Sequence, residues 1–217
     1  GPMLGELTLR NARLRGDDPA IVFEGRTLSH RTFAERALRL VDAFARAGIG
    51  RGDRVAIVAQ NCPEYLECYA AGELGGWTTV TVNYRLAAPE VAYILGDSKP
   101  KAVIVEEGYR HLLLPEALSG VDRVVTIGGT ENGYEALVRS GEPRTPVPVP
   151  PDDVAYLIYT SGTTGRPKGV MLTRRGQVSA ARIGALAGAI RPTDRRGLVM
   201  PLYHIGGRTQ SLAHQLI

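Results

Sequence analysis

Short runs rich in apolar and β-branched residues recur along the chain, as expected for strands buried on both faces of a parallel sheet. In the first two thirds they lie at 20–24, 55–59, 78–82, 102–105 and 123–126. Between the first two, apolar residues from Phe33 to Ala45 have helical spacing, with Ser29 as the expected N-cap and Gly48 as the stop. This alternation predicts an α/β fold with a mostly parallel sheet flanked by helices.

Turn and cap residues place further elements. Gly25 and Arg26 are expected to turn the first strand back toward residues 27–28. Asn61, as N-cap, and Pro63, in the first turn, are expected to open a second helix, and a third is expected at 89–95.

The remainder of the chain continues the pattern after a proline-rich stretch. Five prolines within 143–151 predict a stiff connector between a first α/β part, residues 4–142, and a second part, residues 152–217. Residues 1–3 are expected to be an expression scar. In the second part, strands are expected at 154–158, 170–173 and 198–200, and helices at 176–190 and 209–217. The last helix shows no stop residue, so we expect it to lack a cap and a packing partner.

Composition restricts the function classes. Apolar and charged residues make up 44% and 22% of the 217 residues, as in ordinary globular proteins, and no apolar run is long enough to span a membrane. Two cysteines suggest neither a disulfide scaffold nor a metal site, and we expect a cytoplasmic protein. The net charge of +4 comes from scattered arginines without aromatic platforms, which argues against nucleic-acid binding.

The segment after the 154–158 strand carries the clearest chemistry. It reads Tyr-Thr-Ser-Gly-Thr-Thr-Gly-Arg-Pro-Lys-Gly-Val over residues 159–170, and its lysine is one of only three in the chain. Glycines allow backbone N–H groups to crowd around an anion, and hydroxyls and a lysine add donors and charge. These features predict a phosphate-binding loop. The Walker A pattern of P-loop phosphotransferases differs in spacing and in its final Ser or Thr, so that reading is disfavoured.

Residues 159–170 resemble the phosphate-binding signature of the AMP-forming, adenylate-forming ligase superfamily. Residues 82–86, 89–91 and 95–98 are similar to an earlier part of that family, and residues 201–204 resemble its next motif in the acyl- and aryl-CoA synthetase form. The resemblance implies the N-terminal subdomain of the adenylate-forming fold. Because family members are longer, we expect an N-terminal piece of an acyl-CoA synthetase that is inactive alone.

The resemblance implies ATP with Mg²⁺ as nucleotide, a carboxylic acid as substrate, and CoA as co-substrate. The residues that it implies for the β- and γ-phosphates are Thr160, Ser161, Gly162, Thr163, Thr164, Gly165 and Lys168. Lys168 would also be catalytic, by stabilising the departing pyrophosphate. Tyr159 is expected to pack rather than to contact ligand. No residue is predicted as a metal ligand.

His204 is the second catalytic candidate. The resemblance places it in the carboxylate pocket, where a neutral imidazole could orient the substrate; the alternative is a histidine that only satisfies backbone groups. Residues 201–207 contain no acidic side chain to pair with a substrate ammonium, so a fatty or aryl acid is favoured over an α-amino acid.

Two alternatives stay open at this point. The chain could be a non-catalytic nucleotide-binding or interaction module that kept the phosphate loop. It could also form a homo-oligomer through an exposed surface.

Overall fold

The computed structural model describes residues 3–130, 133–146, 148–160 and 165–217. Six of the described strands form one sheet in the order β6-β5-β3-β4-β7-β8, and two more form a separate antiparallel pair. The strands of the larger sheet are β3 (Arg54–Val58), β4 (Thr78–Val82), β5 (Ala102–Glu106), β6 (Arg123–Ile127), β7 (Val154–Thr160) and β8 (Lys168–Thr173). All of its neighbouring strands run parallel except β7 and β8, which form an antiparallel hairpin at one edge.

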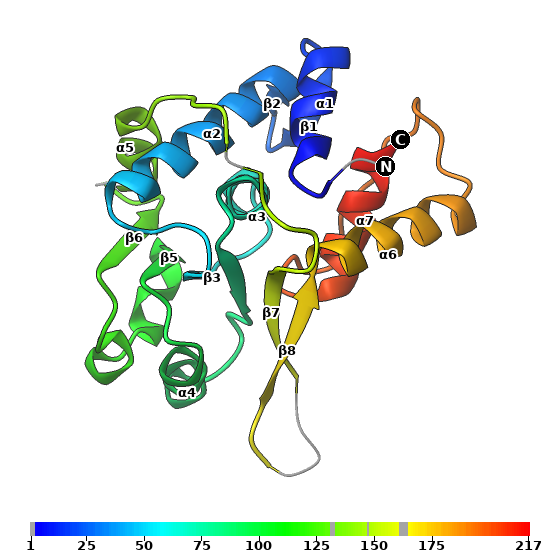
Figure 1. Cartoon of the computed structure of the whole chain (residues 1–217). Helices are drawn as coiled ribbons and strands as arrows, with labels where there is room; N and C mark the ends of the chain where they lie inside the picture. The colour runs from blue at the N-terminus through cyan, green and yellow to red at the C-terminus, as the bar shows by residue number, and fades with distance from the viewer. Residues whose placement is uncertain (1–2, 131–132, 147, 161–164) are drawn as a thin grey trace.

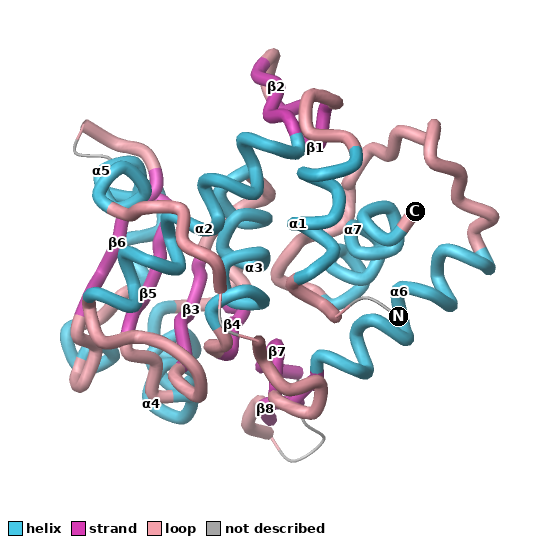
Figure 2. The backbone as a smooth tube through the Cα atoms, turned by 45° about the horizontal axis from the view of Figure 1, so that its top comes forward, coloured by secondary structure: helices cyan, strands magenta, loops and turns pink. Residues whose placement is uncertain are grey.

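Helices cover both faces of this sheet, as Figures 1 and 2 show. On one face the apolar core joins the sheet to α1 (Glu6–Leu14), α2 (His30–Arg46), α3 (Pro63–Gly75), α5 (Gly133–Ser140), α6 (Arg174–Ala187) and α7 (Ile205–Leu216). On the other face a second core contains α4 (Ala88–Ser98) and the 3-10 helices η1 (Glu107–Leu112) and η2 (Pro115–Leu118). The predicted α/β class with a mostly parallel, helix-flanked sheet is confirmed.

The strands of the sheet divide their side chains between these two cores. Along β3, Val55 and Ile57 belong to the first core, whereas Ala56 and Val58 belong to the second. Both sets are buried, because successive side chains of a strand point to opposite faces and helices cover each face. This double burial explains the uninterrupted apolar runs of the sequence.

Most of the predicted elements are present. The pair β1 (Pro19–Phe23) and β2 (Arg26–Ser29) turns back where expected, and the Ser29 hydroxyl accepts the Thr32 N–H as the N-cap of α2. The described residues of the proline-rich stretch 143–150 lie in no helix or strand. Because β7 pairs with β4, the stretch connects parts of one sheet; the division of the chain at residues 143–151 stays a prediction.

Three predictions were wrong. Residues 198–200 form no strand; the carbonyls of Leu198 and Met200 accept hydrogen bonds from the Asn61 side chain instead of pairing in the sheet. Asn61 is therefore not the N-cap of α3, a position that Cys62 occupies without a side-chain cap.

The third wrong prediction is that the last helix, α7, lacks a cap and a packing partner at its C-terminal end. Arg10 donates to the carbonyls of Gln215 and Leu216, and Asn11 donates to Gln215, each at 2.8 Å. Side chains of α1 therefore satisfy carbonyls that a helix leaves without partners. Since α7 also packs on α6 and α1, it lacks neither a cap nor a packing partner.

Candidate active site

The predicted phosphate loop joins the two strands of the β7–β8 hairpin. Thr160, the last residue of β7, lies opposite Lys168, the first residue of β8. Both side chains are exposed. Gly165 has a φ of +89°, a conformation that favours glycine, and a side chain there would meet no other atom within 4 Å. Ser161, Gly162, Thr163 and Thr164 lie outside the described residues.

The stems of this loop are attached to α4 on the neighbouring face. The Tyr159 hydroxyl donates to the Asp97 carboxylate at 2.6 Å, and the Tyr93 hydroxyl donates to the Pro167 carbonyl at 3.3 Å. The Arg166 guanidinium lies over the Tyr93 ring, 5.7 Å from its centroid. Burial, followed by the hydrogen bond to Asp97, raises the pKa of Tyr159. Tyr159 thus acts as a neutral donor that anchors the hairpin.

His204 lies at the N-cap of α7 and is exposed. Its Nδ1 accepts the Gly206 N–H at 3.1 Å, an arrangement that requires an unprotonated Nδ1 and leaves Nε2 free of this bond. The first turn of α7 contains no acidic residue. The imidazole therefore satisfies a backbone group, as the alternative for this residue expected, and its second nitrogen is available for another partner.

His204 and the Thr160–Lys168 end of the hairpin lie at the same edge of the sheet, the one formed by the carboxyl ends of its parallel strands. The carbonyl of Tyr203 accepts a hydrogen bond from the Thr81 hydroxyl at 2.8 Å, near the end of β4. Strand β4 pairs in parallel with β7, with Thr81 opposite Ile158, so both strands end at this edge. In open α/β sheets, ligands bind at the carboxyl ends of the strands. The fold therefore places the two predicted catalytic residues, Lys168 and His204, at the edge where a ligand is expected.

Several buried polar residues near His204 were missed by sequence reasoning. Arg208, one turn further along α7, is fully buried and forms an ion pair with Glu73 of α3. Its Nε donates to the Tyr156 hydroxyl at 3.0 Å, and its guanidinium lies 4.7 Å from the centroid of the Tyr69 ring. Burial lowers the pKa of Arg208, but Glu73 and Tyr156 outweigh burial and raise it, so Arg208 stays charged. The sequence signal that could have revealed this buried ion pair is the position of Arg208 on the apolar face of its helix.

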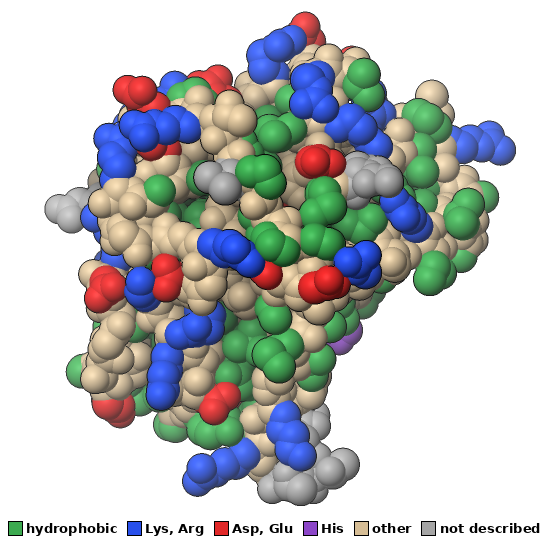
Figure 3. Space-filling view, viewed as in Figure 1, with side chains coloured by type: hydrophobic (Ala, Val, Ile, Leu, Met, Phe, Trp, Pro, Cys, Tyr) green, Lys and Arg blue, Asp and Glu red, His purple; other side chains and the backbone are tan. Residues whose placement is uncertain are grey.

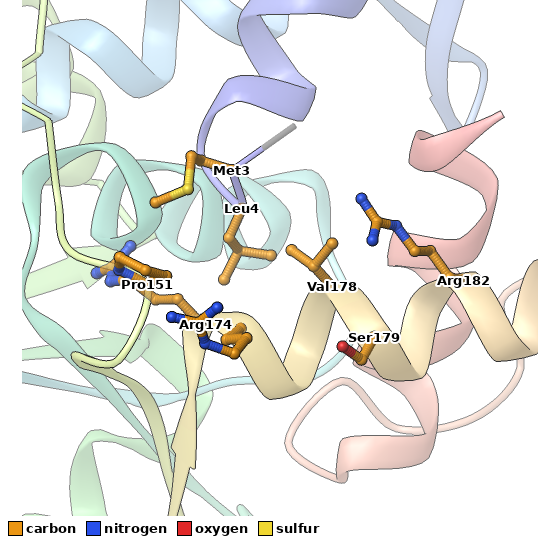
Figure 4. Close-up of a pocket in the computed structure, with 8 residues that line it drawn as sticks. Met3, Leu4, Pro151, Arg174, Val178, Ser179 and Arg182 are labelled. Atoms are coloured by element: carbon orange, nitrogen blue, oxygen red, sulfur yellow. The ribbon is translucent and has the colours of Figure 1, made fainter. Parts of the chain in front are cut away.

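Besides a larger cavity of about 300 Å³ that Asp97, Tyr159 and Gly169 border beside the hairpin, the described residues form a cavity of about 180 Å³ that lies away from the Thr160–Lys168 end of the hairpin. It is bordered by Met3, Leu4, Pro151 and residues of α6, among them Val178 and Arg182, and Figure 4 shows Val178 on α6 pointing toward Leu4. Because α6 begins directly after β8, this cavity lies at the opposite end of the hairpin from Lys168. We therefore assign it no part in the predicted chemistry.

No group of three His, Cys, Asp or Glu side chains that could hold a metal ion occurs in the described ranges. None of the helices described is both long and apolar enough to cross a membrane. On the face in Figure 3, Lys and Arg side chains are dispersed and intermixed with Asp and Glu.

The mostly parallel sheet flanked by helices on both faces, with an antiparallel hairpin at one side, defines an α/β protein whose candidate ligand site lies at the carboxyl ends of the strands. Residues 9–216 match the AMP-binding enzyme family, and the chain belongs to that family.

The relatives and the solved structures that resemble this chain are named as ligases of carboxylic acids. The chain is 32% identical to the fatty acid–[acyl-carrier-protein] ligase ScoC of Streptomyces coeruleorubidus, over 94% of this chain and 40% of the relative. It is 37% identical to the long-chain-fatty-acid–CoA ligase FadD13 of Mycobacterium tuberculosis, over 80% of this chain and 35% of that protein. A crystal structure of a putative long-chain-fatty-acid CoA ligase from Rhodopseudomonas palustris superimposes with a TM-score of 0.85 at 32% identity, covering 99% of this chain and 55% of that one. The chain thus spans about 40% of the length of its curated relatives.

Proposed function

We propose that this chain is the N-terminal part of an ATP-dependent synthetase that activates a fatty or aryl acid as its acyl-adenylate and transfers the acyl group to CoA. The observation that carries the proposal is the placement of Thr160 and Lys168 at one sheet edge, beside the strand end that holds the segment of His204. Membership of the AMP-binding enzyme family and the names of the relatives support it.

The first half-reaction joins two anions. A carboxylate oxygen of the acid attacks the α-phosphorus of ATP, and the bond from that phosphorus to the oxygen bridging to the β-phosphate breaks, releasing pyrophosphate. The exposed ammonium of Lys168 and the Thr160 hydroxyl offer donors to the phosphate oxygens, which lowers the repulsion and stabilises the leaving group. ATP would bring Mg²⁺ as a further positive charge on its phosphates.

His204 has a different role in this proposal. With Nδ1 occupied by the Gly206 N–H, its Nε2 can donate a hydrogen bond to the substrate carboxylate and orient it for attack. In the second half-reaction the CoA sulfur attacks the acyl carbon, the bond to the AMP oxygen breaks, and the thiol proton passes to solvent. The products are the thioester and AMP.

The absence of an acidic residue in the first turn of α7 supports an acid without an ammonium group. The relatives include proteins named for fatty acids, for feruloyl-CoA and for 3-hydroxybenzoate, which supports a fatty or aryl tail.

The experiment is carboxylate-dependent exchange between ATP and pyrophosphate, with a panel of fatty, aryl and amino acids. It is run on the 217-residue chain and on a longer polypeptide that spans the full length of the relatives. We expect exchange with a fatty or aryl acid in the longer protein and little in the 217-residue chain. Nucleotide binding by the longer protein without exchange for any acid would favour the non-catalytic module instead.

Exposed apolar residues support the further proposal that the chain associates with itself. Val170 and Met171 on the edge strand β8, and Ile183 and Leu186 on α6, are between 42% and 82% exposed. Surfaces of this kind often mark interaction sites. Light scattering after size exclusion should give a mass above that of one chain, whereas a strictly monomeric mass would contradict the proposal.

A further inference from the structure

Residues 198–204, which lead into His204, form no helix or strand, yet their backbone is held at several points. Buried backbone groups need hydrogen-bond partners, and a segment without secondary structure must find them elsewhere. Here the partners are side chains of residues that come more than 100 positions earlier in the sequence.

Asn61, in the loop after β3, makes three of these bonds. Its Nδ2 donates to the carbonyls of Met200 at 2.9 Å and Leu198 at 3.3 Å, and its Oδ1 accepts the Leu202 N–H at 2.7 Å. Both ends of the amide are therefore used on one segment.

Tyr69 and Thr81 bond to the backbone carbonyls of Leu202 and Tyr203. The Tyr69 hydroxyl, on α3, donates to the Leu202 carbonyl at 2.6 Å, and the Thr81 hydroxyl, on β4, donates to the Tyr203 carbonyl at 2.8 Å. Tyr69 and Thr81 are both buried, and so is the Leu202 side chain. The hydroxyls therefore connect the segment to α3 and to β4.

The geometry beyond Tyr203 depends on this attachment. A turn bonds the His204 N–H to the Pro201 carbonyl at 3.1 Å, and the Gly207 N–H donates to the His204 carbonyl at 3.1 Å. The Gly206 N–H donates to Nδ1 of His204 itself. The orientation of the imidazole is thus coupled to the backbone that the three side chains hold.

We propose that Asn61, Tyr69 and Thr81 are positioning residues that set the location and orientation of His204 at the sheet edge. The consequence for carboxylate activation rests on the proposed function, whereas the positioning itself does not. These residues are not expected to touch substrate; they act through the backbone of residues 200–204.

Two threonines of β4 provide a matched test. Thr81→Val removes the hydrogen bond to the Tyr203 carbonyl, and Thr78→Val removes a comparable bond, 3.1 Å long, to the Val154 carbonyl. Both replace a hydroxyl by a methyl group in the same strand. Amide hydrogen exchange of His204, Gly206 and Gly207 is measured by NMR in each variant of the 217-residue chain, together with the urea midpoint.

We expect Thr81→Val to accelerate exchange of these three amides by at least about tenfold, and Thr78→Val to leave them unchanged at a similar loss of global stability. Asn61→Ala and Tyr69→Phe should accelerate the same amides. Equal exchange in Thr81→Val and wild type would overturn the proposal, as would equal acceleration in the two threonine variants.

The catalytic consequence is tested in the longer polypeptide. Thr81→Val should raise the KM for the carboxylate several-fold and leave the KM for ATP near the wild-type value, whereas a general loss of folding would lower only the active fraction. Unchanged KM values would overturn this consequence. If the wild-type protein showed no exchange between ATP and pyrophosphate, the proposed function would fail, while the hydrogen-exchange result would still decide the positioning.

Discussion

The Arg208 guanidinium on α7 forms an ion pair with the Glu73 carboxylate on α3, and neither side chain is more than 1% exposed. The Tyr156 hydroxyl on β7 bonds to both partners. This contact joins three elements that lie far apart in the sequence and fixes α7, the helix that His204 begins. A charge that is buried with its partner is tolerated, but it becomes costly when the partner is removed.

Arg208→Met should therefore reduce the free energy of unfolding by about 3–5 kcal/mol, because it leaves the buried Glu73 carboxylate without its ion-pair partner. The double variant Glu73→Gln with Arg208→Met should recover a large part of this loss. Urea unfolding followed by circular dichroism measures both. The control is Arg175→Met, which breaks an exposed pair with Asp152 and should cost no more than about 1 kcal/mol. Similar losses for Arg175→Met and Arg208→Met would contradict the interpretation.

Gly207 is required by close packing rather than by its dihedral angles. A Cβ at this position would lie 2.4 Å from the Pro201 carbonyl oxygen, so Gly207→Ala must displace the segment before His204. We expect a destabilisation of about 1–3 kcal/mol, the usual cost of overpacking.

The matched control for this substitution is Gly96→Ala in α4, where an added Cβ would meet nothing within 4 Å. Because alanine favours helices, that variant should be neutral or more stable by up to about 1 kcal/mol. The unfolding temperatures of the two variants are compared with that of the wild type. A Gly207→Ala protein as stable as the wild type would contradict the prediction, because the segment before His204 could then move at little cost in free energy.

His204 combines a structural and a proposed chemical role, and two substitutions separate them. Asparagine is a good N-cap and alanine is a poor one, so His204→Asn should retain stability while His204→Ala loses about 1 kcal/mol. If the imidazole orients the carboxylate, both variants of the longer polypeptide should lose most of their pyrophosphate exchange. A wild-type rate of exchange between ATP and pyrophosphate in His204→Asn would show that His204 acts only as the N-cap of α7.

Lys168 is expected to act through its charge. Lys168→Ala in the longer polypeptide should lower the rate of pyrophosphate exchange by about 10²-fold, the effect of removing one donor to a developing anion. Since the side chain is exposed, the unfolding midpoint should not change. Lys99→Ala, which alters another exposed lysine, is the control. Equal exchange rates for Lys168→Ala and wild type would exclude the proposed role.

Stability should fall in acid partly because of Asp42. The backbone N–H of Glu142, and then the Arg46 guanidinium, lower the pKa of Asp42 below its usual range. A depressed carboxyl pKa stabilises the folded state above the unfolded pKa of about 3.9, and this contribution is lost as the pH falls through the folded value. Asp42→Asn should therefore lower the urea midpoint at pH 7 and flatten its decline below about pH 4. Asp17→Asn, at an exposed carboxylate, is the control and should follow the wild-type curve. A steep acid decline in Asp42→Asn would assign the effect to other groups.

Local patterns in the sequence were enough to predict most elements of this protein. The sheet strands from β3 to β7 appear as short apolar runs because both of their faces are buried, and Ser29 signals its helix through a bond to a residue three positions away. The phosphate-loop prediction also depends on one contiguous segment, residues 159–170. These features involve neighbours in the chain, so the order of residues alone determines them.

The tertiary structure decided the features whose partners are distant in sequence. Asn61 looks like an N-cap, but its amide bonds to residues 198–202, which consequently need no strand to satisfy their carbonyls. The last carbonyls of α7 are capped by Arg10 and Asn11 of α1, and the counter-charge of Arg208 is Glu73 of α3. No local pattern encodes such pairs, because a side chain chooses among all polar groups that folding brings within hydrogen-bond distance. The sequence by itself therefore determined the class of fold and pointed to the segment that is predicted to bind phosphate, whereas only the folded chain decided how His204 is held.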